Sequence, residues 1–240
     1  MTTRVPARAV ILAGGLGARL APYTTVFPKP LMPIDGRPIL ELVLRRLKMQ
    51  GVEQVVLAVS YLEELIRAFF GDGRRFGLQV EYFREEQPLG TVGSLSLIKG
   101  LPDPTLVLNG DILTTIDVAD MVAMHQQNQA SMTVATQHRE VGIDYGVLDV
   151  VDGGRIVGYR EKPKLSYSVS AGLNLISHDA LSHLRPGERC DIPDLVARLL
   201  TAGKTVIGFG GEYYWRDIGR PADYELVNQE FPGIKREFGL

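Results

Sequence analysis

Apolar residues in the first half of the chain alternate between short runs and helical stripes. Residues 9–12 form a short apolar run closed by glycines, which is typical of a buried strand. Apolar residues over 40–47 recur at helical spacing before Gly51, which predicts an amphipathic helix and its end. The same patterns predict strands over residues 55–59, 79–83 and 105–108, and helices over residues 62–70 and 93–99. This alternation indicates βαβ units and a parallel sheet.

The second half is richer in expected strands. They cover residues 131–137, 145–151, 155–159, 168–177 and 205–209. Asp152-Gly153-Gly154 predicts a hairpin turn between two of them, and helices are expected over residues 192–202 and from Pro221 onward. We therefore expect the α/β class: one Rossmann-like, mostly parallel sheet flanked by helices, with a smaller mixed β region and no C-terminal β-helix.

Composition narrows the class of protein. Of 240 residues, 45% are apolar, which is enough for a sizeable core. Lys plus Arg is 26 and Asp plus Glu is 28, a net charge of −2 that argues against a nucleic-acid coat. The single cysteine, Cys190, fits a reducing compartment, and no apolar run approaches the roughly 18 residues of a membrane span. We expect a cytoplasmic protein that binds neither nucleic acid nor membrane.

Charge is unevenly distributed along the chain. Residues 1–50 contain eight basic and two acidic residues, a local charge of +6, so residues 51–240 carry −8. A basic first segment on a mildly acidic protein is a first indication of an anion site.

A glycine-rich loop directly follows the first strand. Gly14, Gly15 and Gly17 would let backbone N–H groups approach a phosphate, and open α/β sheets bind ligands at the carboxyl ends of their strands. A tight turn without a ligand is the alternative. The loop lacks the Gly-Lys-Ser/Thr of a Walker A motif, and Leu20 and Pro22 break the dinucleotide-binding fingerprint.

Two cations accompany this loop. Arg19 follows the glycines, and Lys29 stands between Pro28 and Pro30 in a stiffened segment. A lysine fixed in this way suits contact with a polyphosphate at a set place, whereas a solvated surface cation would need no such restraint.

The pattern Gly15-x-Gly17-x-Arg19-Leu20-x-Pro22-x-Thr24 followed by Pro28-Lys29-Pro30-Leu31 resembles the signature of the sugar-1-phosphate nucleotidylyltransferases. The resemblance runs from Val10 to about Glu230 and implies an enzyme that joins a sugar 1-phosphate to an NTP and releases pyrophosphate. It implies one catalytic domain over residues 1–240, with nucleotide-binding (about 1–130) and sugar-phosphate-binding (about 131–240) parts.

Asp111 ends a predicted strand in Asn109-Gly110-Asp111, where an Asx turn and a Mg²⁺ ligand are both reasonable. The resemblance implies that Asp111 and Asp217, the latter in Trp215-Arg216-Asp217-Ile218-Gly219, are the metal ligands. Two carboxylates on Mg²⁺ suit a reaction that builds up negative charge on phosphate.

The resemblance also assigns the two substrates. It places the nucleotide on Leu12, Ala13, Gly14, Gly15, Gly17, Gln87, Gly90, Thr91 and Asp111. It places the sugar phosphate on Gly146, Glu161, Lys162, Gly172 and Asn174. Taken alone, Glu161 and Lys162 could form an exposed ion pair, and the two glycines could mark strand bulges.

Arg19, Lys29 and Lys162 would be the catalytic cations, two on the pyrophosphate portion and one on the attacking phosphate. The segment Pro88-Leu89-Gly90-Thr91-Val92-Gly93 is similar to that of guanylyltransferases and favours GTP, with mannose 1-phosphate or a heptose 1-phosphate. The alternatives are glucose 1-phosphate with UTP or dTTP, a phosphocholine-type cytidylyltransferase, and a non-catalytic NDP-sugar-binding regulator. A homo-oligomer is left open.

Overall fold

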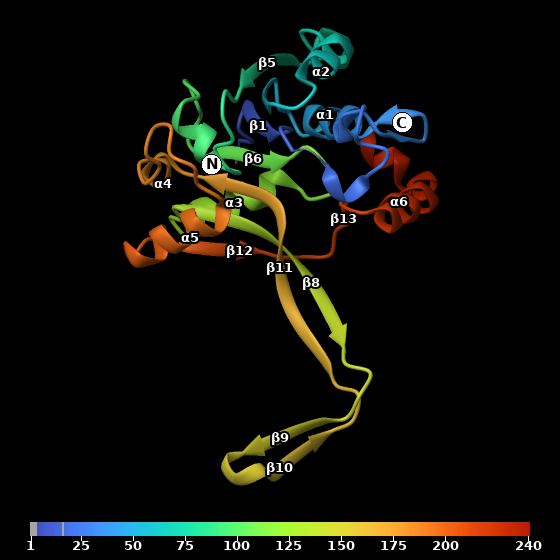
Figure 1. Ribbon diagram of the computed structural model, residues 1–240. Helices are drawn as coiled ribbons and strands as arrows, with labels where there is room; N and C mark the ends of the chain where they lie inside the picture. Colours follow the sequence, from blue (N-terminus) through green and yellow to red (C-terminus); the bar gives the residue numbers. More distant parts are fainter. Residues whose placement is uncertain (1–3, 16) are drawn as a thin grey trace.

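The expected mostly parallel sheet is present in the computed structural model, which describes residues 4–15 and 17–240 (Figure 1). Its strand order is β12-β8-β11-β6-β1-β4-β5. The strands are β1 (Arg8–Leu12), β4 (Gln54–Val59), β5 (Gln79–Arg84), β6 (Thr105–Asn109), β8 (Met132–Gly142), β11 (Lys164–Ile176) and β12 (Val206–Phe209). Strand β11 runs antiparallel to both of its neighbours, and the remaining pairs are parallel. The predicted α/β class is confirmed.

Helices cover the sheet much as the apolar stripes predict. They are α1 (Ile39–Met49), α2 (Glu63–Phe70), α3 (Val118–Gln127), α4 (His178–Leu181), α5 (Ile192–Thr201) and α6 (Pro221–Ile234). The helix expected over residues 93–99 is only a 3₁₀ turn over Gly93–Ser96. Helix α3 was not expected; the Asp117 side chain caps it by accepting from the N–H groups of Ala119 and Asp120.

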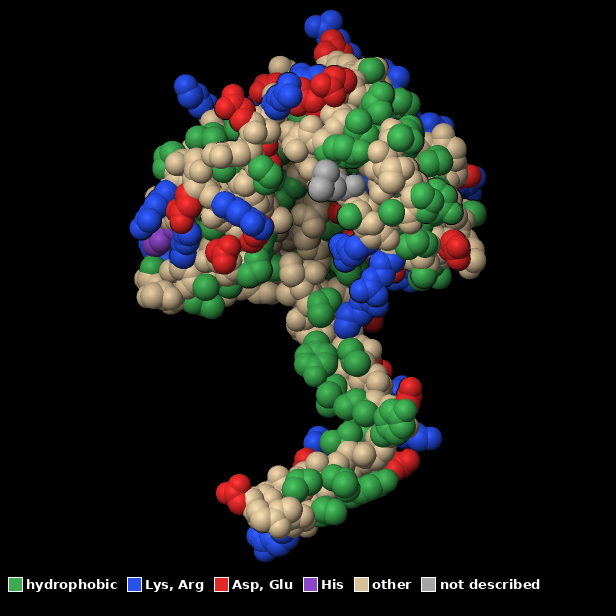
Figure 2. Space-filling view, in the orientation of Figure 1, with side chains coloured by type: hydrophobic (Ala, Val, Ile, Leu, Met, Phe, Trp, Pro, Cys, Tyr) green, Lys and Arg blue, Asp and Glu red, His purple; other side chains and the backbone are tan. Residues whose placement is uncertain are grey.

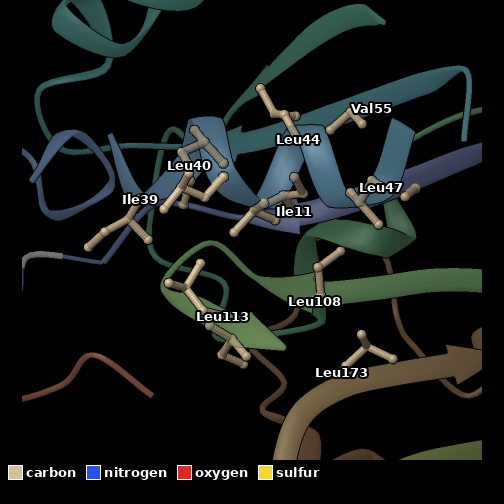
Figure 3. Packing of buried hydrophobic residues seen from close by; sticks show 14 of the residues in the cluster. Ile11, Ile39, Leu40, Leu44, Leu47, Val55, Leu108, Leu113 and Leu173 are labelled. Carbon is tan, nitrogen blue, oxygen red and sulfur yellow. The ribbon is translucent and has the colours of Figure 1, made fainter. Parts of the chain in front are cut away.

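Strand β1 is buried on both faces, which explains its uninterrupted apolar run. Ile11 packs with Leu44 and Leu47 of α1 on one side of the sheet (Figure 3), while Val10 packs with Leu195 of α5 on the other. All of these side chains are at most 2% exposed. The carboxyl end of β1, where the glycine loop begins, is therefore held from both sides.

Two short strands that the sequence patterns did not predict lie beside this end of the sheet. Strand β7 (Ile112–Thr114) pairs antiparallel with β13 (Trp215–Asp217). The N–H of Ile218 donates to the backbone oxygen of Asp111 over 3.1 Å, which continues the pairing by one residue. Residues 111 and 217 are thereby brought together from opposite ends of the sequence. A further short pair is β2 (Pro33–Ile34) with β3 (Arg37–Pro38).

The smaller mixed β region is continuous with the central sheet. Strands β8, β11 and β12 continue the central sheet, and β8 and β11 then run beyond it as a two-stranded ribbon. The ribbon ends in a hairpin of β9 (Val147–Val151) and β10 (Arg155–Arg160), joined at the predicted turn. We call residues 136–170 the arm, which projects from the body of the molecule (Figure 1).

Among the described residues, no helix has the length and apolar character needed to cross a membrane.

Candidate active site

A cleft of about 350 Å³ opens at the carboxyl ends of β1 and β6. This is the edge at which open α/β sheets bind ligands. Its lining includes seven of the residues expected to contact nucleotide, phosphate or metal, namely Leu12, Ala13, Gly15, Gly17, Arg19, Lys29 and Asp111. Gly219 also lines it. The structure thus brings the glycine loop, two cations and a carboxylate into one cleft.

Lys29 is held inside this cleft rather than on the surface. It begins a 3₁₀ turn over Lys29–Leu31, between the two prolines noted in the sequence, and is only 8% exposed. Its ammonium group forms an ion pair with Oδ2 of Asp111. The other oxygen, Oδ1 of Asp111, is buried and has no hydrogen-bond partner in the described part of the chain. A buried carboxylate oxygen left unpaired is well suited to a cation ligand.

Asp217 lies close enough to Asp111 for the two carboxylates to repel each other. Burial, followed by repulsion from Asp111, raises the pKa of Asp217, while attraction to Lys29 and Arg19 opposes that rise. A Cβ on Gly219 would lie 3.5 Å from both Arg19 Nη2 and the carboxylate oxygens of Asp217, which places the Arg19 guanidinium and the Asp217 carboxylate on either side of the same small space.

The donor set fits magnesium. Within residues 4–15 and 17–240, no three His, Cys, Asp or Glu side chains cluster as a complete metal cage. Mg²⁺ is commonly bound by one or two carboxylates together with substrate phosphates, rather than by protein ligands alone. Asp111 and Asp217 are such a pair, beside a cleft lined by the glycine loop, Arg19 and Lys29.

A second cavity, of about 440 Å³, lies at the base of the arm, and Asp217 is one of its lining residues. Expected sugar-contacting residues Gly172 and Asn174 line it, together with Asn109 and Trp215. Asn174 is 2% exposed and its Oδ1 is buried without a partner among the described residues. An unpaired amide oxygen on a half-apolar wall suits a hydroxyl-bearing ligand.

A third cavity, of about 330 Å³, adjoins both others and extends the cleft towards β4. The predicted nucleotide residues Gly14, Gly90 and Thr91 line it, with Glu85 and Pro88. Gln87, predicted to contact the base, is exposed and does not line the cavity. Burial raises the pKa of Glu85.

The segment around Thr91 is locked to the start of α5. Oδ1 of Asp191 accepts from the N–H of Thr91 over 2.9 Å, and Oγ1 of Thr91 accepts from the N–H of Ile192 over 2.8 Å. The two segments lie a hundred residues apart in sequence, so the position of Thr91 in the third cavity depends on tertiary contact.

Besides Gln87, three predicted residues lie outside all three cavities. Gly146, Glu161 and Lys162 are all exposed on the arm. They do lie near one another, because Tyr159 donates to Glu161 over 2.6 Å and a Cβ on Gly146 would meet that same Tyr159 hydroxyl.

Several lining residues were not predicted. Asn109 and Trp215 stand within motifs that the sequence analysis quoted, but only their neighbours were given roles. Asp191 carries a local signal, because it stands at the N-cap of α5 before Pro193, yet a cap alone does not indicate a ligand site. Glu85 carries none.

Gly172→Ala is expected to destabilise the protein and to narrow the second cavity. Gly172 has a φ of +70°, and an added Cβ would lie 2.3 Å from Ile112 Cδ1 and 2.8 Å from Asn109 Nδ2. Backbone strain and crowding together predict a loss of about 2–3 kcal/mol of unfolding free energy in urea denaturation.

Gly153→Ala is the matched control for that change. Gly153 also has a positive φ, +81°, but nothing lies within 4 Å of the added Cβ. It should cost only the strain, about 1 kcal/mol. Equal losses for the two variants would show that Gly172 is not crowded.

Comparison with known proteins gives consistent matches. The family model described as nucleotidyl transferase matches residues 8–232. The chain is 31% identical to a UTP–glucose-1-phosphate uridylyltransferase of Synechocystis, over 97% of this chain and 68% of the relative. It is 34% identical to the mannose-1-phosphate guanylyltransferase of Mycobacterium tuberculosis, over 90% of this chain but only 62% of that protein.

One curated relative matches along nearly its whole length. It is the D-glycero-alpha-D-manno-heptose 1-phosphate guanylyltransferase of Aneurinibacillus thermoaerophilus, 31% identical over 92% of this chain and 97% of the relative. Among solved structures, HddC from Yersinia pseudotuberculosis aligns with a TM-score of 0.73 and 25% identity, over 93% of this chain and 99% of that one. HddC has also been solved in complex with GMP-PN.

Proposed function

Because this chain belongs to the nucleotidyl transferase family, and to the sugar-1-phosphate nucleotidylyltransferases within it, we propose that it joins GTP to mannose 1-phosphate or a closely related sugar 1-phosphate. The observation that carries the proposal is the convergence of the glycine loop, Arg19, Lys29 and Asp111 in one cleft, with Asp217 close to Asp111 at the adjoining cavity.

In the proposed reaction, a phosphate oxygen of the sugar 1-phosphate attacks the α-phosphorus of the nucleotide. The new P–O bond forms as the bond from the α-phosphorus to the oxygen bridging to the β-phosphate breaks, and pyrophosphate leaves. The attacking phosphate monoester is largely ionised near neutral pH, so no strong general base is needed. Catalysis then rests on positioning and on neutralising charge.

Each cleft residue has a role in this scheme. Arg19 and Lys29 would hold the β- and γ-phosphates that depart, while the glycine loop would admit the phosphates close to its backbone N–H groups. Asp111 and Asp217 would hold Mg²⁺, which when bound neutralises charge on the phosphates. Asn109 and Asn174 face the second cavity, where their amides could bond sugar hydroxyls.

The guanine preference is supported by the relatives. Two guanylyltransferases match at 31% and 34% identity, and a nucleotide complex of HddC contains GMP-PN. A second candidate is the uridylyltransferase reaction on glucose 1-phosphate, because a relative of that name covers 97% of this chain at 31% identity.

Pyrophosphate release across a grid of substrates tests the proposal. ATP, CTP, GTP, UTP and dTTP would each be combined with mannose, glucose and heptose 1-phosphates in the presence of Mg²⁺. We expect the largest kcat/KM for GTP with mannose or heptose 1-phosphate. A maximum for UTP with glucose 1-phosphate would favour the second candidate, and no turnover with any pair would favour a regulatory binding protein.

A further inference from the structure

The outer part of the arm is not bonded to the body of the molecule. Within the described part of the chain, residues 140–166 form hydrogen bonds and ion pairs only with one another. Nearer the body, the guanidinium of Arg139 lies 5.3 Å from the ring centre of Trp215 and anchors the base of the arm. Beyond that point the arm stands free (Figure 1).

The hairpin at the end of the arm has an uncovered apolar face. Leu148 pairs with Tyr159 and Val150 pairs with Ile156, and these four side chains are 45–62% exposed. The opposite face instead carries an ion pair between Asp149 and Arg160. Hydrophobic side chains are visible along the arm in Figure 2. Since an isolated two-stranded hairpin is only marginally stable in water, this face calls for a partner surface.

The arm also carries a group of residues that belongs to the expected site. Tyr159, Glu161 and Gly146 are adjacent, and Lys162 follows with a φ of +42°. A positive φ at a residue other than glycine is strained backbone, and such strain is concentrated at functional positions. The arm therefore presents a formed cluster with an exposed lysine at its edge.

That cluster is held far from the cavity of its own copy. Ser170 lines the second cavity, and the β8–β11 ladder runs without interruption from Thr136 opposite Ser170 to Gly142 opposite Lys164. Six residues of strand place Lys164 about 20 Å beyond Ser170. A lysine side chain cannot span that length, and folding the ribbon back would break its ladder hydrogen bonds.

The second cavity lacks the positive charge that the arm carries. Among the described residues that line it are two acids, Asp191 and Asp217, and no Lys or Arg. A sugar 1-phosphate brings about two negative charges at neutral pH, which this lining cannot balance. Lys162 and Lys164 on the arm carry the positive charge that the lining lacks.

We propose that two copies of this chain exchange arms, so that the arm of each copy covers the second cavity of its partner and brings Lys162 to the sugar phosphate there. The inference rests on the proposed function for the identity of that ligand. Because each copy has the same arm and the same cavity, a twofold exchange fills both cavities with one type of interface. Exchange of an identical element is also a low-cost route to a dimer.

The oligomeric state is the first test, and it does not depend on activity. By light scattering, we expect the wild-type chain to have the mass of two copies and the Leu148→Asp/Ile156→Asp variant the mass of one, with an unchanged helical circular dichroism signal. Leu200→Asp, on an exposed leucine of α5 (59% exposed), should remain a dimer. A monomeric wild-type protein at micromolar concentration would overturn the proposal and leave the proposed function standing.

Complementation tests whether the site is shared. Asp217→Asn alters the body and Lys162→Ala alters the arm, and each alone should be nearly inactive with sugar 1-phosphate. When they are co-expressed with different tags and the heterodimer is purified, exchange places the intact arm on the intact body at one of two sites. We expect about half of the wild-type activity. A heterodimer no more active than its parents would show that each arm serves its own copy.

Two controls complete this design. A heterodimer of Asp217→Asn with Lys29→Ala has both changes in the body and should stay inactive. A benzoylphenylalanine at position 145, in a mixture of isotope-labelled and unlabelled protein, should crosslink between copies to residues lining the second cavity. Crosslinks within single copies only would refute the exchange. Crosslinks between copies without turnover on any substrate would instead refute the proposed function.

Discussion

Asp217→Asn should lower kcat about 10²–10³-fold and, at the same time, stabilise the metal-free protein. The loss of activity follows from removing one of two carboxylates proposed to hold Mg²⁺, an electrostatic contribution of the size measured for single charge-stabilising groups in other enzymes. The gain in stability follows from the raised pKa of Asp217, which burial and the neighbouring Asp111 cause. A raised carboxyl pKa means that the folded state disfavours the charge.

The expected change in unfolding free energy depends on pH. Above the folded pKa of Asp217 the wild-type protein must bear the unfavourable charge, whereas asparagine bears none, so the variant should have the larger free energy of unfolding at neutral pH in EDTA. Below the ordinary aspartate range the carboxyl is protonated in both states, and the advantage should vanish. Urea denaturation at both pH values measures it. A variant less stable than wild type at neutral pH would contradict the repulsion between the two carboxylates.

Lys29→Ala should reduce kcat/KM for the nucleotide about 10²–10³-fold, because it removes a buried cation placed on the departing phosphates. It should also move the acid limb of the pH–rate profile to higher pH. Lys29 lowers the pKa of Asp217, so its loss lets that pKa rise, and protons then compete with the metal for the carboxylates over a wider range.

Lys48→Ala provides the matched control for charge. Lys48 is an exposed cation in the last turn of α1 and lies outside the three cavities. Its loss should leave kcat/KM and the pH profile unchanged. If both lysine variants behaved alike, Lys29 would be acting only through net charge, and its place in the cleft would carry no weight.

Much of the fold and of the glycine-loop cleft could be predicted from the sequence because both depend on local patterns. The unbroken apolar run of β1 required cover on both faces, and the glycines after it required a loop at the ligand-binding edge. The prolines around Lys29 restrict its backbone independently of any tertiary contact. Gln87, the predicted base contact, is exposed and lies outside the third cavity, and the sequence could not indicate this because exposure depends on distant packing.

Long-range geometry decided what local patterns could not. Asp111 and Asp217 share a site because β7 pairs with β13. Each of these strands has only three residues, which is too few for an alternating pattern to predict it. Thr91 meets Asp191 for the same kind of reason. The length of β8 and β11 was also underestimated, because the outer part of the ribbon is polar and satisfies its backbone without burying a face.

By itself, then, the sequence determined the α/β class, the glycine loop after the first strand and the chemical nature of the cations and carboxylates, because composition and spacing record local backbone requirements and reactive groups directly. Only the tertiary structure decided which of those groups meet. It gathered Arg19, Lys29, Asp111 and Asp217 around one cleft and carried Lys162 away on the arm. A sequence motif determines only the spacing of its residues along the chain. The length of the β8–β11 ribbon determines how far from the cleft the motif that contains Lys162 lies.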